Sequence, residues 1–243
     1  MRTLLVAAVG VPFTVAAAML YILLCLIRPV ARGPMAVERA WAAAMLRLAG
    51  VELSARGTEH LRPGESYVVM PNHRSWFDIP VLFLALAGRD VRWVGKKEIV
   101  PVPFFGWAFR VSRHVVIDRG DREKAVRAIR RAAALGGRGV SVLIFPEGTR
   151  SPTPELLPLK KGGFHLAIEA GLPILPVAIE GTEWIMPKRA WRIRPGRVRV
   201  TFLAPEPPPR TQAGLPGAAA RVGGRIAATL GGHPATPLPQ EVR

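Results

Sequence analysis

The longest uninterrupted apolar run lies at the N-terminus, where residues 3–27 contain no charged side chain. At about 1.5 Å per helical residue, such a run is long enough to cross a hydrocarbon core of roughly 30 Å. We therefore expect a membrane-embedded helix here, with a kink where Pro12 removes a backbone hydrogen bond. A signal peptide is the weaker alternative, because its apolar region is usually about 7 to 15 residues long.

A second helical pattern covers residues 35–49. Its apolar side chains recur along one face, at Val37, Trp41, Met45 and Leu48. Such a face either packs on its own domain or lies at the lipid interface, where a tryptophan close to arginines is favourable. Residues 1–50 are therefore predicted to form an N-terminal element, consisting of a membrane helix and an amphipathic interfacial helix.

From residue 51 onward, short apolar runs alternate with helical patterns, which is typical of an α/β domain. The expected strands are 51–56, 66–70, 91–95, 115–117, 140–145, 174–179 and 197–202, and the expected helices are 79–86, 104–111, 121–135 and 164–170. We expect this domain to span residues 51–205. Residues 206–243 are rich in Pro, Gly and Ala and are predicted to be a tail, with a weak helix at 218–230 and disorder from 233.

Chemically capable side chains follow the second strand, in the sequence Pro-Asn-His-Arg-Ser-Trp-Phe-Asp at 71–78. Residues five apart lie roughly 140° apart around a helix, so His73 and Asp78 cannot meet on a regular helix. A turn between strand and helix would bring them together at the carboxyl edge of the sheet, where α/β folds place their sites. An imidazole held by a carboxylate is a general base of fixed tautomer. Alternatively, Asp78 only caps the following helix.

A second polar block, Phe-Pro-Glu-Gly-Thr-Arg-Ser at 145–151, follows another apolar strand. This block and the Asn-His-x-x-x-x-Asp pattern at 72–78 resemble motifs of the glycerolipid acyltransferase family, whose bacterial type is the 1-acyl-glycerol-3-phosphate acyltransferase. Val-Ile-Asp-Arg at 116–119 and Ile-Leu-Pro-Val-Ala-Ile at 174–179 resemble two further motifs. The motifs occur in the family's order, so the resemblance is specific for the family and covers roughly residues 51–205.

The resemblance implies an α/β fold with a mixed sheet flanked by helices, and a two-helix N-terminal element seated on the bilayer. It also implies acyl transfer from acyl-CoA or acyl carrier protein to the free sn-2 hydroxyl of 1-acyl-glycerol-3-phosphate, which gives phosphatidic acid. In this family the histidine is the general base and the aspartate orients it, which implies these roles for His73 and Asp78. The residues matched to substrate binding are Asn72, Arg119, Glu147, Gly148, Thr149, Arg150, Lys160 and Lys161.

Charge supports some of these assignments. Lys160 and Lys161 precede a helix, and the positive end of the helix dipole there is unfavourable for two cations. A bound phosphate would compensate both positive charges and the dipole. Lysines reaching lipid headgroups or water are the alternative. The planar guanidinium groups of Arg119 and Arg150 suit phosphate, with surface ion pairs as the alternative. Glu147 would repel a phosphate, so we expect it to orient an arginine or the acceptor hydroxyl.

The chain carries thirty-four Lys and Arg against seventeen Asp and Glu, a net charge of +17. Such a charge indicates an anionic partner, for which an anionic lipid membrane and a lysophospholipid acceptor are expected, and nucleic acid is not. Arginines are more frequent after the apolar run than before it, which predicts an inner-membrane protein with its catalytic domain in the cytoplasm. The rival hypotheses are the same chemistry on another lysolipid, such as a lyso-ornithine lipid, and a basic membrane-surface protein without catalysis.

Neither a cofactor nor a metal is expected. The sequence contains no GxGxxG, P-loop or HExxH pattern, and its five histidines are scattered. Acyl-CoA or acyl carrier protein would enter only as the acyl-donor substrate. A single cysteine, Cys25, excludes an intrachain disulfide.

Overall fold

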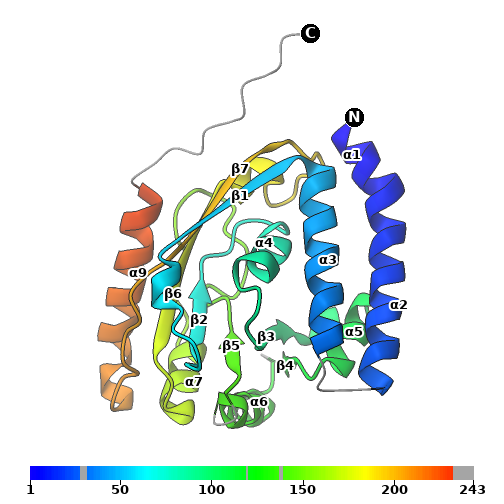
Figure 1. The fold of residues 1–243 in the computed structure, drawn as a ribbon. Helices are drawn as coiled ribbons and strands as arrows, with labels where there is room; N and C mark the ends of the chain where they lie inside the picture. Colours follow the sequence, from blue (N-terminus) through cyan, green and yellow to red (C-terminus); the bar gives the residue numbers. More distant parts are fainter. Residues whose placement is uncertain (28–31, 119, 137–138, 232–243) are drawn as a thin grey trace.

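The computed structural model describes residues 1–27, 32–118, 120–136 and 139–231. Its strands are β1 (Val51–Arg56), β2 (Val68–Pro71), β3 (Val91–Lys96), β4 (Val115–Ile117), β5 (Ser141–Leu143), β6 (Ile174–Glu180) and β7 (Gly196–Phe202). They form one seven-stranded sheet in the order β1-β7-β6-β2-β5-β3-β4 (Figure 1). Strands β6, β2, β5, β3 and β4 are parallel, and the antiparallel pairing of β6 with β7 reverses β7 and β1. The expected mixed sheet is confirmed.

The helices are α1 (Arg2–Leu5), α2 (Val11–Ile27), α3 (Arg32–Ala49), α4 (Asp78–Ala85), α5 (Phe105–Val111), α6 (Arg122–Gly136), α7 (Gly162–Ala170), α8 (Thr182–Ile185) and α9 (Leu215–Gly231). Short 3-10 turns lie at Thr58–His60, Lys97–Ile99 and Gln212–Gly214. Every strand and helix expected from the sequence is present. Helix α8 has no counterpart among the expectations, because four residues are too few to show a periodic pattern.

The strand order determines where the site can form. Strand β2 lies between β5 and β6 and is parallel to both. The segments that leave these three strands therefore start at the same edge of the sheet, although they are far apart in sequence. They are the stretch after Pro71, the stretch after Leu143 and the stretch after Glu180.

Alternating strand residues point to two separate cores, as the period of a strand requires. Val69 packs into a core with α3 and α4, whereas its neighbours Val68 and Met70 pack into a core with α6, α7 and α9. Strands β2 and β6 are buried along their whole length, which explains their continuous apolar sequence. The sheet is therefore covered by helices on both faces (Figure 1).

Helix α9 belongs to this packed structure, although the sequence analysis assigns it to a tail. Its buried side chains recur at helical spacing, at Leu215, Ala218, Val222 and Ile226. They join the core formed by β6 and α7. The weak helix expected at 218–230 is thus a covering helix of the sheet. The stretch expected to be disordered, from residue 233 onward, lies outside the described residues.

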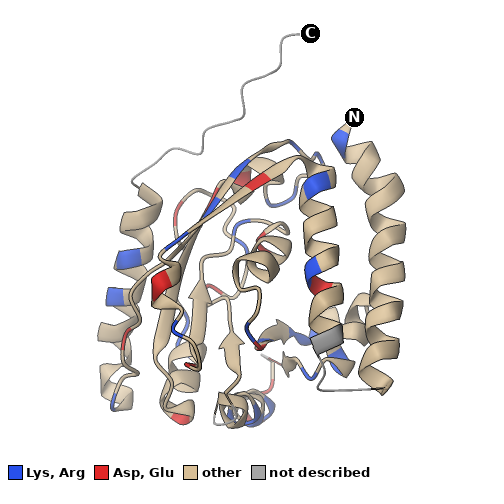
Figure 2. Ribbon diagram, viewed as in Figure 1, with Lys and Arg blue, Asp and Glu red and all other residues tan. Residues whose placement is uncertain are grey.

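The N-terminal helix runs from Arg2 to Ile27 and includes a π-helical turn at Val6–Gly10. This turn ends two residues before Pro12, whose nitrogen cannot donate a hydrogen bond to the preceding turn. In the described part of the chain, this is the one helix long and apolar enough to cross a membrane. Figure 2 shows Lys or Arg on it only at its N-terminal end.

The N-terminal helix is attached to the rest of the protein near its start and its middle. The Arg2 guanidinium donates to the Leu48 carbonyl at 3.3 Å, and the Ile193 amide donates to the Thr3 hydroxyl at 2.9 Å. Further along, the Trp41 indole donates to Thr14 at 2.9 Å. Helix α2 also packs against α3 and α5. The helix therefore lies alongside the α/β domain rather than projecting from it (Figure 1).

Candidate active site

The carboxylate of Asp78 is the centre of the polar site. It is fully buried, with 0% of the residue exposed. Its Oδ2 atom lies 2.7 Å from His73 Nδ1 and accepts backbone N–H groups from Arg74 at 2.8 Å and Ser75 at 2.9 Å. Its Oδ1 atom accepts the hydroxyl of Thr182. The expected contact between His73 and Asp78 is present, and Asp78 also begins α4, so the two sequence interpretations are compatible.

These donors define the tautomer of His73. Because Asp78 Oδ2 already accepts two backbone N–H groups, it acts as an acceptor toward His73 as well, and Nδ1 carries the proton. The lone pair is then on Nε2. Phe145 stacks on the imidazole, with ring centroids 3.9 Å apart and an interplanar angle of 19°. The ring is thereby fixed from its edge by Asp78 and from its face by Phe145.

Glu147 holds the main chain of the site. Its Oε1 atom accepts the His73 amide at 2.6 Å and its Oε2 atom accepts the Leu157 amide at 2.9 Å. Only 2% of the residue is exposed, and burial raises the pKa of its carboxyl above the ordinary value, although the two amides lower it. Glu147 therefore joins the turn of His73 to the loop of Leu157. Both carboxylate oxygens are engaged by main chain, which differs from the expectation that Glu147 orients an arginine or a hydroxyl.

Asn72 has a similar role. Its side-chain amide donates to the Ile179 carbonyl at 2.9 Å and its side-chain oxygen accepts the Ile179 amide at 2.7 Å. The residue is 1% exposed. Asn72 thus continues the pairing of β2 with β6 by means of its side chain, whereas the resemblance implies a substrate contact.

Gly148, Thr149 and Arg150 line a cavity that also reaches His73. The Arg150 guanidinium lies 4.7 Å from the centre of the Trp76 ring, and the Arg150 carbonyl accepts the Lys188 ammonium at 2.6 Å. Burial lowers the pKa of Arg150, and the Asp78 carboxylate opposes this effect. A half-buried arginine therefore lies at the same cavity as His73.

The three remaining residues predicted to bind substrate either lie outside the cavity lining or are outside the described residues. Lys160 and Lys161 are exposed, and neither is among the described residues that line the cavity. The Lys160 amide donates to the Pro146 carbonyl at 2.8 Å, and Lys161 directly precedes α7. Arg119 lies outside the described residues. The structure therefore brings the 145–151 block to His73 but leaves the two lysines at the surface.

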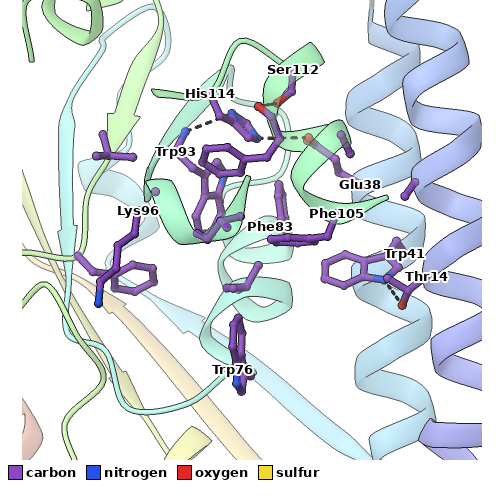
Figure 3. A pocket seen from close by; sticks show the side chains of 18 of the residues that line it. Thr14, Glu38, Trp41, Trp76, Phe83, Trp93, Lys96, Phe105, Ser112 and His114 are labelled. Atoms are coloured by element: carbon purple, nitrogen blue, oxygen red, sulfur yellow. Dashed lines mark hydrogen bonds and ion pairs between the residues drawn. The ribbon is translucent and has the colours of Figure 1, made fainter. Parts of the chain in front are cut away.

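The cavity has a volume of about 340 Å³ and a mostly apolar wall (Figure 3). The domain contributes a series of large side chains, namely Trp76, Ile79, Phe83, Trp93, Phe105 and Phe109, whereas α2 and α3 contribute Ala17, Ala18, Val37 and Trp41. Lys96 and Arg150 are cationic groups on the same wall. An elongated apolar molecule with one anionic end would match this lining.

The far end of the cavity contains a buried polar pair, Glu38 and His114, opposite Trp76 (Figure 3). His114 Nδ1 accepts the Trp93 amide at 3.3 Å, and its Nε2 lies 4.0 Å from Glu38 Oε1. Burial lowers the pKa of His114 to about 3 and raises the pKa of Glu38 to about 7. His114 is therefore neutral, and the contact is not an ion pair near neutral pH. In the described chain, no group of three or more His, Cys, Asp or Glu side chains forms a metal-binding cluster.

Sequence reasoning did not identify two partners of the dyad. Phe145 begins the polar block at 145–151, but nothing in its position in the sequence indicates that it stacks on His73. Thr182 follows Asp78 by 104 residues and lies in no motif, so only the strand order brings the two together.

The fold and the site define a mixed α/β protein in which a buried His–Asp pair opens onto an apolar cavity. Residues 52–180 match the family model described as Acyltransferase. The chain therefore belongs to the Acyltransferase family.

Curated proteins named 1-acyl-sn-glycerol-3-phosphate acyltransferase are among the relatives of this chain. The protein from Cocos nucifera is 35% identical over 162 residues, covering 66% of this chain and 52% of its own. The Pseudomonas aeruginosa PAO1 protein is 35% identical, covering 64% and 59%, and the human alpha form is 34% identical, covering 66% and 56%. The chain thus spans about half the length of the curated relatives it matches.

A solved structure has the same fold. The crystal structure of the 1-acyl-sn-glycerophosphate (LPA) acyltransferase PlsC from Thermotoga maritima superimposes with a TM-score of 0.75. The match covers 97% of this chain and 100% of the other, at 24% sequence identity. It supports the architecture described above, including the N-terminal helices.

The buried position of Glu38 predicts a pH-dependent stability. Its carboxyl has a pKa of about 7 in the folded protein against an ordinary value of 4.5, so the folded state is penalised as pH rises through this window. Glu38→Gln removes the ionisation. We expect the variant to be more stable than the parent at pH 8, with little difference at pH 5. Urea unfolding in detergent at both values measures this effect.

Glu169→Gln, on an exposed position of α7, is the matched control and should have little effect at either pH. A gain of equal size at pH 5 and pH 8 for Glu38→Gln would show that packing, and not ionisation, is responsible.

Proposed function

We propose that the protein transfers an acyl group from an acyl thioester to the free sn-2 hydroxyl of 1-acyl-glycerol-3-phosphate, giving phosphatidic acid. The observation that carries this proposal is the His73–Asp78 contact of 2.7 Å at the wall of an apolar cavity. The names of the matched relatives support the choice of acceptor. Acyl-CoA or acyl carrier protein is the proposed donor.

The chemistry follows from the tautomer of His73. Its Nε2 atom takes the proton of the acceptor hydroxyl as the oxygen attacks the thioester carbonyl. The new C–O bond forms, the C–S bond breaks, and the thiolate leaves and receives the proton from Nε2. A thiol has a reference pKa of about 8.5, so it leaves more readily than an alkoxide, and one base is sufficient. Asp78 stabilises the imidazolium that exists between the two proton transfers.

The apolar cavity is the proposed site of the donor acyl chain. A thioester carbonyl beside His73 would have its chain directed along the aromatic wall toward α2 and α3. Transfer of the acyl chain out of water favours this binding, at about 0.8 kcal/mol for each buried CH₂ group. The acyl chain would then lie between the N-terminal helices and the α/β domain.

The cationic groups suit the anionic head of the acceptor. Arg150 presents a planar guanidinium held on Trp76, which is favourable for bidentate binding of phosphate. Glu147 supports this site indirectly, through the main chain of His73. Arg119, Lys160 and Lys161 are further proposed phosphate or headgroup contacts on the basis of the resemblance.

The N-terminal helix is the proposed membrane contact, on the cytoplasmic side of the inner membrane. Its outward side chains include Leu20, Leu23 and Leu26, which are 48%, 53% and 70% exposed. Because Thr3 and Arg2 are hydrogen-bonded to the rest of the protein, the helix would be embedded together with one face of the domain. The net charge of +17 favours an anionic lipid surface.

Thiol release from palmitoyl-CoA tests the reaction and the acceptor. We expect release by the detergent-purified protein with lysophosphatidic acid, and much less with other lysolipids or without acceptor. His73→Ala should reduce turnover by about 10²-fold or more, because the general base is lost. His60→Ala is the matched control, since His60 lies in a 3-10 turn outside the cavity lining.

Other outcomes distinguish the rivals. Release that depends on a lyso-ornithine lipid would keep the chemistry and change the acceptor. No release with any acceptor, from either acyl-CoA or acyl carrier protein, would favour a non-catalytic basic membrane protein.

Asp78→Asn tests the dyad with little change in shape. The carboxamide can keep its oxygen toward His73, Arg74 and Ser75 and direct its NH₂ group to the Thr182 hydroxyl, so we expect a folded protein. Turnover should fall about 10²- to 10⁴-fold, because the negative charge beside the imidazole is lost. Steady-state kinetics and circular dichroism measure the two effects. Near-normal turnover would show that Asp78 is only a helix cap.

Ala17→Phe tests the acyl site. Ala17 lines the cavity from α2, so a larger side chain should shorten it and shift the preferred donor toward shorter acyl-CoA species. Ala16→Phe is the matched control, because the neighbouring residue is exposed on the outer side of the helix. Comparison of kcat/KM from octanoyl-CoA to stearoyl-CoA measures the shift. An unchanged chain-length profile would place the acyl chain elsewhere.

A further inference from the structure

The turn from His73 to Asp78 is held by a segment that belongs to no recognised motif, Thr182–Met186, called here the 182–186 segment. Three hydrogen bonds join the two. The Thr182 hydroxyl donates to Asp78 Oδ1, the Arg74 guanidinium donates to Glu183 at 3.1 Å, and the Ser75 hydroxyl donates to the Met186 carbonyl at 2.8 Å. The two residues that follow His73, Arg74 and Ser75, and the aspartate that contacts it, Asp78, are thus positioned by one segment.

The 182–186 segment is itself fixed in place. It follows β6 through Gly181, whose φ of +95° is unfavourable for other residues, and a Cβ atom there would lie 2.2 Å from the Arg197 carbonyl oxygen. Glu183 accepts the Gly181 amide at 3.0 Å, which closes the turn. The segment is therefore a rigid support that begins where a central strand ends.

Thr182 has a particular position in this support. Asp78 Oδ2 receives three N–H groups, but the Thr182 hydroxyl is the one donor that the described residues provide to Oδ1. Both Thr182 and Asp78 are 0% exposed, so no bulk water replaces a missing donor. Without this hydroxyl, Oδ1 would be a buried carboxylate oxygen with no donor among the described residues, which favours rotation about the Cβ–Cγ bond against the N–H groups that hold Oδ2 toward His73.

We propose that Thr182 is a positioning residue for the His73–Asp78 dyad. Its hydroxyl fixes the rotation of the Asp78 carboxylate, so that Oδ2 keeps facing His73 Nδ1 and the lone pair of Nε2 keeps facing the cavity. The inference rests on the proposed function, in which His73 is the general base. It assigns part of the catalytic geometry to a residue outside the family motifs.

The test compares two substitutions at one position. Thr182→Val keeps the shape and removes the hydroxyl, whereas Thr182→Ser keeps the hydroxyl. We expect Thr182→Val to lower kcat by about 10- to 100-fold, as for loss of a hydrogen bond to a charged group, with KM for both substrates nearly unchanged. Thr182→Ser should retain most of the activity. Ser141→Ala is the matched control, because it also removes a buried hydroxyl. This hydroxyl accepts the Tyr67 amide at 3.1 Å and has no contact with the dyad.

A second measurement does not depend on turnover. In protein labelled with ¹⁵N-histidine, the Nδ1 proton of His73 should give a strongly downfield NMR signal in the parent and in Thr182→Ser, and this signal should be lost or shifted in Thr182→Val. An unchanged signal together with unchanged kcat in Thr182→Val would overturn the proposal. So would equal losses of kcat in Thr182→Val and Ser141→Ala, or in Thr182→Val and Thr182→Ser.

These outcomes are distinct from failure of the proposed function. If the parent shows no turnover with any donor, or if His73→Ala keeps full turnover, the reaction assignment fails. The NMR comparison then still decides whether Thr182 positions the pair.

Discussion

The buried carboxylate of Asp78 is the interaction on which the site depends. An ionised carboxylate without partners in a protein interior is strongly unfavourable, so its burial requires donors that are already in place. Four groups provide them: the imidazole of His73, the amides of Arg74 and Ser75, and the hydroxyl of Thr182. The amides of Arg74 and Ser75 belong to the turn itself, so they can donate to Asp78 only when the turn has this conformation. The shape of the turn and the orientation of the histidine thus have one common cause.

The polar blocks at 71–78 and 145–151 contain two groups of residues with different roles. Asn72 and Glu147 use their side chains to bind main chain, of Ile179 and of His73 and Leu157, and are almost completely buried. His73 and Arg150 instead face the cavity. A carboxylate beside a proposed phosphate site is unfavourable if it faces the ligand, but Glu147 directs both oxygens to backbone amides. Its negative charge is therefore compensated before any substrate is bound.

Much of the fold could be predicted from the sequence, because each strand and long helix has its own hydrophobic period. The contact of His73 with Asp78 could also be predicted, since a turn between a strand and a helix is local. The partners Thr182 and Phe145 could not, because their distance from the dyad is set by the order β5-β2-β6, which no local pattern encodes. The assignment of α9 to a tail has a related cause. The helix is rich in Ala and Gly, so its pattern is weak, and only four of its side chains form the buried face that packs against β6 and α7.

The cavity gives the N-terminal helices a role beyond that of the proposed membrane contact. Ala17 and Ala18 of α2 face inward and line the cavity, whereas Leu20 and Leu23 of the same helix face outward. One helix therefore separates the space beside His73 from the surroundings of the protein. The small side chains of Ala17 and Ala18 leave room for a ligand beside Tyr21, and the large exposed apolar side chains on the outer face suit the proposed contact with lipid. Without these helices the aromatic wall would be open to water, so the apolar site and the proposed membrane contact are two faces of one element.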